Sequence, residues 1–189
     1  DGDTGTNLSL TMEAALAGID RVAADASLAE VCHAVTHGSL MGARGNSGVI
    51  LSQILRGLCE VLVLATTIDG ALVRDALDRA VTVSFQAVRK PVEGTMLTVL
   101  RDTAAAAGPA DDADGDLSEV LNACVDAAYE SVKRTPELLP VLKEAGVVDA
   151  GGYGRALLLE GLAFGLIGTG LPSFAVTVRP ATGVVMCDW

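Results

Sequence analysis

The sequence predicts an all-α protein, built as an antiparallel up-and-down bundle or barrel of helices. Half of its 189 residues are hydrophobic but only 3% are aromatic, so the core must consist of Ala, Leu, Val and Ile. Ala and Leu favour helix, and small side chains let helices approach closely. Apolar residues recur at helical spacing in successive segments, and the short loops between them favour antiparallel neighbours.

The apolar periodicity defines seven long helices. In the first, apolar residues from Leu8 to Val22 fall on one face, and Pro91 ends the fourth. The Gly-, Pro- and Asp-rich stretch 108–116 is expected to be an exposed loop. The predicted helices span residues 5–24, 28–42, 47–65, 70–89, 95–107, 117–134 and 151–167.

Thr135 and Pro136 resemble a fresh helix start, with Thr as the cap and Pro at the first position. Pro140 soon disturbs this pattern, so we expect residues 135–146 to be a short helical continuation. We expect residues 1–168 to form one helical domain and residues 169–189, with a β-like run at 174–178, to form a tail or linker.

Charge and composition exclude several classes of function. The net charge of −11 and a pI near 4.4 argue against a general nucleic-acid partner or an anionic membrane surface. Polar residues interrupt the apolar stretch 49–65, so it predicts a core helix and no membrane span. Four dispersed cysteines predict buried free thiols in a reducing cytosol, so we expect a cytoplasmic protein. It opens on Asp-Gly-Asp without an initiator Met, which predicts a fragment.

Glycine-rich polar clusters stand just before four of the predicted helices. Alternate helices of an up-and-down bundle begin at the same end. If residues 117–146 form one broken element, all four clusters therefore meet at one end; if 135–146 is a full helix, the last cluster moves to the other end. The clusters are Asp1-Gly2-Asp3-Thr4-Gly5-Thr6-Asn7, Gly45-Asn46-Ser47-Gly48, Gly94-Thr95 and Asp149-Ala150-Gly151-Gly152.

Four helix N-termini at one rim would form an anion site, and phosphate is the usual anion. The side chains of Thr6, Asn46, Ser47 and Thr95 add groups that can bond phosphate oxygens. Asp1 and Asp3 supply hard oxygen ligands that suit Mg²⁺ beside such a site. Each cluster alone is more often a plain turn and helix cap; the combination carries the prediction. There is no P-loop motif and no dinucleotide-binding glycine motif.

At these residues the sequence resembles the nucleotide-binding domain shared by dihydroxyacetone kinases and the larger subunit of bacterial fatty acid kinase. Four motifs occur in that family's order, and the resemblance spans about residues 1–168. The second motif resembles the fatty acid kinase branch more closely. The motifs are Asp1-Gly2-Asp3-Thr4-Gly5-Thr6-Asn7, Ala43-Arg44-Gly45-Asn46-Ser47-Gly48-Val49-Ile50-Leu51-Ser52-Gln53, Glu93-Gly94-Thr95-Met96 and Asp149-Ala150-Gly151-Gly152.

The resemblance implies a helical barrel with ATP at one end and Mg²⁺ held by Asp1 and Asp3. It places the turn from Thr4 to Asn7 at the phosphates, Met96 at the adenine and Asp149 to Gly151 at the nucleoside. Family members carry a helix and a further metal ligand before Asp-Gly-Asp; removing that helix would expose apolar surface. The nucleotide-binding residues expected are Thr4, Gly5, Thr6, Asn7, Asn46, Ser47, Gly48, Thr95, Met96, Asp149, Ala150 and Gly151.

The implied activity is transfer of the γ-phosphoryl group of ATP to a fatty acid carboxylate presented by a carrier protein. One alternative is a dihydroxyacetone-type kinase with a small hydroxy-ketone acceptor, and another is a nucleotide-binding module without turnover. A purely structural bundle would leave the four clusters unexplained. No catalytic general base is identified, and a homodimer is an open alternative.

Overall fold

The structure is a computed structural model that describes residues 2–112 and 116–168. Within these ranges the chain forms helices and no strand, which confirms the predicted all-α class. The helices are α1 (Thr4–Ile19), α2 (Leu28–Gly42), α3 (Gly45–Leu62), α4 (Gly70–Ala87), α5 (Met96–Asp112), α6 (Leu117–Leu138), α7 (Pro140–Ala145) and α8 (Ala150–Ile167). The β-like run at 174–178 and the proposed tail lie outside the described residues.

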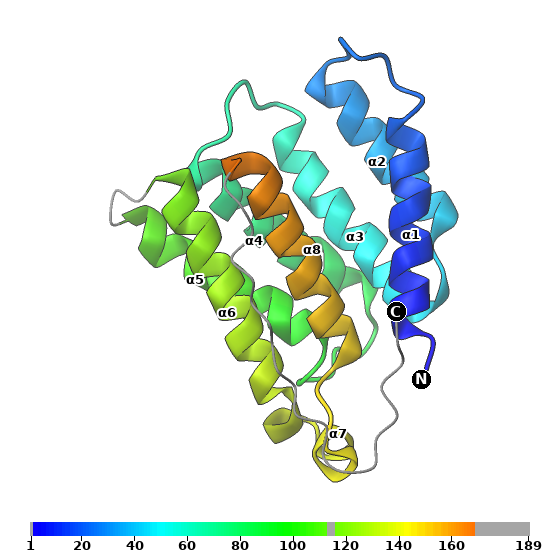
Figure 1. Ribbon diagram of the computed structural model, residues 1–189, viewed down its shortest axis with the longest axis vertical. Helices are drawn as coiled ribbons and strands as arrows, with labels where there is room; N and C mark the ends of the chain where they lie inside the picture. Colours follow the sequence, from blue (N-terminus) through cyan, green and yellow to red (C-terminus); the bar gives the residue numbers. More distant parts are fainter. Residues whose placement is uncertain (1, 113–115, 169–189) are drawn as a thin grey trace.

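The helices form an up-and-down bundle that closes through α8. Each helix from α1 to α5 packs against the helix that follows it, and α8 packs against α6, α5 and α1. Figure 1 shows α8 running antiparallel to α6, with the single turn of α7 connecting them at the lower end. None of the described helices is both long enough and apolar enough to cross a membrane.

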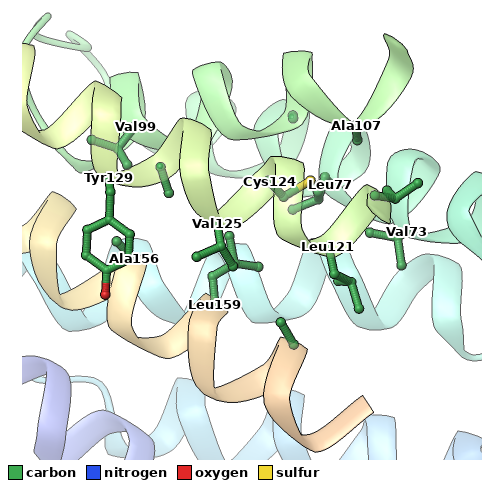
Figure 2. Close-up of a cluster of buried hydrophobic side chains, with 14 of the residues drawn as sticks. Val73, Leu77, Val99, Ala107, Leu121, Cys124, Val125, Tyr129, Ala156 and Leu159 are labelled. Carbon is green, nitrogen blue, oxygen red and sulfur yellow. The ribbon is translucent and has the colours of Figure 1, made fainter. Parts of the chain in front are cut away.

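Small side chains let these helices pack closely, as the composition predicts. The larger core cluster lies among α4, α5, α6 and α8, and Figure 2 shows its side chains converging between the helices. Ala107, Ala128 and Ala156 are fully buried there. A β-carbon added at Gly57 of α3 would lie 2.5 Å from the Cα atom of Ala80 in α4, so these two helices meet almost backbone to backbone.

The cysteines of the described chain behave as the sequence predicts. Cys32, Cys59 and Cys124 are buried and free. Burial raises the pKa of the Cys124 thiol to about 11, so this side chain stays protonated and unreactive at neutral pH. Cys187 lies outside the described residues.

Several predicted boundaries are wrong. The third helix is Gly45–Leu62 and not 47–65, and the fourth ends at Ala87 and not at 89. The first helix ends at Ile19 and not at 24. Beyond Ile19 the backbone N–H groups donate to the carbonyl three residues earlier instead of four, as Val22 N–H does to the Ile19 carbonyl at 2.9 Å. A capping box between Ser27 and Glu30 then starts α2. The expected loop 108–116 is also wrong in part, since α5 continues to Asp112. The fully buried Ala107 shows that α5 is still packed in the core where the predicted loop begins.

Thr135 does not begin a helix, although its sequence context predicts a cap. Helix α6 runs on to Leu138, and the new start is at Pro140. Pro136 has no N–H for the Val132 carbonyl, and the Thr135 hydroxyl donates to that carbonyl instead, at 2.7 Å. Residues 117–145 are thus one long helix followed by one short turn. Of the two open topologies, the structure has the one in which α8 begins at the same end as α1, α3 and α5.

Candidate functional site

The four predicted clusters meet at one cavity. It has a volume of about 240 Å³ and lies where α1, α3, α5 and α8 begin. The loop between α4 and α5 completes its wall. The lining residues are Thr4, Asn46, Ser47, Ile50, Val88, Lys90, Val92, Thr95, Met96, Leu97, Asp149 and Gly151.

The start of α3 is anchored on α1 by Thr11. The Thr11 hydroxyl donates to the Asn7 carbonyl at 2.7 Å and accepts from the Arg44 backbone N–H at 3.2 Å. Gly45 has φ +56°, a left-handed conformation, and a β-carbon there would lie 2.5 Å from the Asn7 amide nitrogen. Gly48 is buried against the same Thr11 hydroxyl. These contacts hold the first turn of α3, with its cavity-lining residues, against α1.

The turn before α5 depends on Gly94. Its φ of +78° is left-handed, and a β-carbon there would lie 2.9 Å from the Thr135 carbonyl and 2.8 Å from the Leu139 β-carbon. Only glycine fits this position without strain. The Gly94 N–H donates to the Thr98 hydroxyl at 3.0 Å, which folds the turn onto the first turn of α5. Thr95, whose hydroxyl donates to the Val92 carbonyl at 2.7 Å, is thereby set in the cavity wall.

Glu93 fixes the same turn from the outside. Its carboxylate accepts two bonds from the Arg101 guanidinium, at 2.7 and 2.9 Å, and one from the Thr98 hydroxyl at 2.9 Å. The bonds from Arg101 and Thr98 lower the pKa of Glu93 below its usual value. Although the pair is exposed, its bidentate geometry restricts the loop more than a single contact would.

Asp149 joins the start of α8 to the start of α5. Its carboxylate caps α8 by accepting from the Gly152 N–H at 2.6 Å, and it also accepts from the backbone N–H of Met96. Burial raises the pKa of Asp149, and the two backbone N–H groups oppose that shift. A β-carbon added at Gly151 would lie 3.4 Å from Met96, so the two helix starts are in contact inside the cavity.

The structure brings seven of the twelve predicted nucleotide-binding residues into the cavity wall: Thr4, Asn46, Ser47, Thr95, Met96, Asp149 and Gly151. Gly5, Thr6, Asn7, Gly48 and Ala150 are not in the wall, although each lies in one of the four clusters. Asn7 and Gly48 are used in the contact between α1 and α3, while Thr6 and Ala150 are exposed to solvent. The binding role of all twelve remains a prediction.

Of the two predicted metal ligands, Asp1 lies outside the described residues. Asp3 is exposed at the N-cap of α1, and its backbone carbonyl accepts from the Asn7 N–H at 2.8 Å. Its carboxylate makes no capping bond and has no ion-pair partner in residues 2–112 and 116–168, so its oxygens are available to a cation. No group of three His, Cys, Asp or Glu side chains in those residues could hold a metal ion.

Five wall residues were not predicted: Ile50, Val88, Lys90, Val92 and Leu97. Ile50 and Leu97 follow predicted residues on the same helix, and helical spacing could have found Ile50, one turn beyond Asn46. Val88 was expected in the fourth helix, which instead ends at Ala87, and Lys90 and Val92 lie in the loop around Pro91, where periodicity carries no signal. Only the path of the chain shows that this loop reaches the cavity.

Comparison with known proteins identifies relatives of this chain. The chain is 43% identical over 176 residues to Protein YloV of Bacillus subtilis (strain 168), covering 93% of the chain and 32% of that protein. It is 42% identical over 168 residues to uncharacterized proteins SH1689 of Staphylococcus haemolyticus and SAB1090 of Staphylococcus aureus, covering 89% of the chain and 30% of each. The chain thus spans about a third of the length of these relatives. The DAK2 domain matches residues 1–164. The chain therefore belongs to the DAK2 domain family, in agreement with the resemblance to dihydroxyacetone kinases.

Proposed function

We propose that this chain is the ATP-binding domain of a kinase that transfers the γ-phosphoryl group of ATP to a fatty acid carboxylate presented by a carrier protein. One observation carries the proposal: the N-terminal segments of α1, α3, α5 and α8 line one cavity in a chain of the DAK2 family. Helix N-termini present unpaired N–H groups and a positive dipole end, which together favour phosphate.

The cavity wall also offers the two environments that a nucleotide needs. Ile50, Val88, Val92, Met96 and Leu97 supply apolar surface against which a base can pack. Hydroxyl and amide groups of Thr4, Asn46 and Ser47 supply donors for phosphate oxygens. Because α5 begins next to the Asp149 cap of α8, the apolar and polar parts of the wall are held in one rigid rim.

Asp1 and Asp3 are the residues that we assign to Mg²⁺. The carboxylate of Asp3 fits this assignment because it makes no capping bond, whereas an N-cap aspartate usually accepts a hydrogen bond from a backbone N–H of the first helical turn. Magnesium seldom sits in an all-protein cage and usually shares phosphate and water ligands, so two carboxylates suffice. When bound, the ion would neutralise phosphate charge during transfer. The chain's own contribution is to position the phosphates and exclude water around them.

The acceptor is the least constrained part of the proposal. The motif from Ala43 to Gln53 resembles the fatty acid kinase branch, which favours a carboxylate acceptor. A carboxylate is already ionised, so it needs no general base, and the cavity wall offers only Asp149, whose oxygens already accept two backbone N–H groups. Dihydroxyacetone-type transfer and nucleotide binding without turnover remain the alternatives.

Calorimetric titration with ATP tests the nucleotide site. We expect binding that requires Mg²⁺, is lost in Asp1→Ala/Asp3→Ala and is strongly weakened in Asp3→Ala. Asp20→Ala is the matched control, because Asp20 is an exposed aspartate at the opposite end of α1. A folded wild-type protein that binds no ATP with Mg²⁺ present would refute the nucleotide-site proposal.

Acceptor-dependent release of ADP then separates the three activities. We expect release with a fatty acid bound to its carrier protein and none with dihydroxyacetone. The reverse result would assign the dihydroxyacetone-type activity. Binding of ATP without release for either acceptor would indicate a nucleotide-binding module. The assay should use the full-length protein, because the matching relatives are about three times as long as this chain.

A further inference from the structure

Lys90 is the cationic side chain of the cavity wall. Of the twelve lining residues, only Lys90 and Asp149 are ionisable. The Asp149 carboxylate is already occupied by the backbone N–H groups of Gly152 and Met96. A bound polyphosphate would therefore meet one uncommitted charged side chain in this wall, and that side chain is positive.

The other basic residues near this rim are committed elsewhere or lie outside the wall. Arg101 is held by Glu93 in a bidentate pair. The Arg44 guanidinium donates to the Ala43 carbonyl at 3.2 Å, and Arg44 does not line the cavity. Lys90 forms no ion pair within the part of the chain that the structure describes. Its ammonium group can thus bind an anionic ligand without first breaking an ion pair.

The backbone of Lys90 is held while its side chain stays free. Pro91 follows it and disfavours a helical backbone conformation at Lys90. Two residues further on, the Val92 carbonyl accepts the Thr95 hydroxyl, and Glu93 is held by Arg101. The loop therefore has a fixed position at the cavity mouth. The exposed lysine side chain has a flexible four-carbon stem with which to reach a ligand.

We propose that Lys90 binds the phosphate chain of the nucleotide, and that it makes the site prefer nucleotides with more phosphates. The inference rests on the proposed nucleotide site and adds a residue that the sequence motifs do not contain. Lysine binds phosphate as a point charge, so its contribution should grow with the charge of the phosphate chain. A lysine that is only solvated on a loop would show no such dependence.

The test compares wild type with Lys90→Ala, Lys90→Arg and Arg89→Ala in calorimetric titrations with adenosine, ADP, ATP and inorganic tripolyphosphate. Arg89 is the matched control, since it is an exposed basic neighbour that does not line the cavity. For Lys90→Ala we expect about tenfold weaker binding of ATP, corresponding to one charge-assisted contact, and unchanged binding of adenosine. Lys90→Arg should recover most of the loss, and Arg89→Ala should bind like wild type.

Salt gives a second readout, because a charge contact is screened and a packing contact is not. The affinity for ATP should fall less steeply with added salt in Lys90→Ala than in wild type. Unchanged ATP binding in Lys90→Ala, or an equal loss for adenosine, would overturn the inference and leave the proposed function intact. If wild type binds tripolyphosphate through Lys90 but no adenine nucleotide, the proposed function fails and the phosphate role stands. If wild type binds none of these ligands, both fail.

Discussion

Two side chains decide how the rim of the cavity is held together. Asp149 accepts from the starts of α5 and α8, and its own backbone N–H donates to the Thr135 hydroxyl at 3.0 Å. The Thr135 hydroxyl in turn donates a hydrogen bond to the Val132 carbonyl. Thr135 is fully buried, so without its hydroxyl the Asp149 backbone N–H and the Val132 carbonyl would both lack a hydrogen-bond partner. The end of α6 and the start of α8 are thus joined through a single hydroxyl.

Thr135→Val should therefore destabilise the protein despite its equal size. It leaves the Asp149 N–H and the Val132 carbonyl without partners, which should cost about 2 kcal/mol. Adding Pro136→Ala should recover part of the loss, because residue 136 then has an N–H for Val132. Urea denaturation of the single and double variants measures both effects. A double variant no more stable than Thr135→Val would show that the Val132 carbonyl does not matter.

The ionisation of Asp149 should make the stability of the fold depend on pH. Burial raises the pKa of this carboxyl above its unfolded value near 3.8, so the folded state holds the proton more tightly than the unfolded state. The stabilising contribution of protonation is present below the unfolded pKa and is lost as pH rises through the folded pKa. Wild type should thus lose stability relative to Asp149→Asn as pH increases from about 4. Denaturation of both proteins between pH 4 and 7 measures this, and parallel curves would contradict it.

At the scale of the element, glycines in helices have opposite roles depending on what faces them. Gly57 in α3 lies against the backbone of α4, so its missing side chain sets the distance between two helices. Gly161 in α8 has no atom within 4 Å of the position a β-carbon would take. In a helix interior alanine is favoured over glycine by about 1 kcal/mol, so packing decides which effect wins.

Gly57→Ala should lower stability and Gly161→Ala should raise it. The first variant must separate α3 from α4 or strain them, at a cost of about 1–3 kcal/mol. The second should gain roughly 0.5–1 kcal/mol, because it restricts the unfolded chain and adds helix propensity. Chemical denaturation of this matched pair measures both signs. Equal effects at the two sites would mean that propensity alone governs these helices.

At the scale of the whole molecule, the bundle contains a second, largely apolar cavity of about 300 Å³, which α1, α3, α4, α5 and α8 line. The buried Arg155 lines it, donating to the Thr103 hydroxyl at 2.9 Å while its Nε atom has no partner in the described chain. Burial lowers the pKa of Arg155. An arginine nevertheless stays charged, so the folded protein carries an incompletely paired charge in its core.

Arg155→Met should therefore be neutral or stabilising. Methionine fills irregular apolar space, and Thr103 keeps a partner because its hydroxyl donates to the Val99 carbonyl at 2.6 Å. The free energy of unfolding in urea at pH 7 measures the change. Arg155→Ala is the contrasting variant, since it removes the charge but leaves a larger void and should be less stable than Arg155→Met. A strong loss in Arg155→Met would show that the guanidinium is needed for the fold.

The helices and the four rim clusters could be predicted from the sequence because their signals are local. Apolar spacing sets the face of each helix, and glycine and polar residues just before a helix set its start. These signals placed Asn46, Ser47, Thr95 and Asp149 at helix N-termini, as the structure has them.

Three features were decided only by tertiary packing. Helix α6 continues past Pro136 to Leu138, and the buried Thr135 in this stretch accepts the Asp149 backbone N–H from the start of α8 at 3.0 Å. Helix α5 is still buried in the core where a loop was expected to begin. Lys90 and its valine neighbours reach the cavity because the loop between α4 and α5 is held by Glu93 and Arg101. In each case the outcome depends on contacts that the local sequence pattern does not show. A prediction from apolar spacing alone cannot locate those contacts, because they form only when the chain folds.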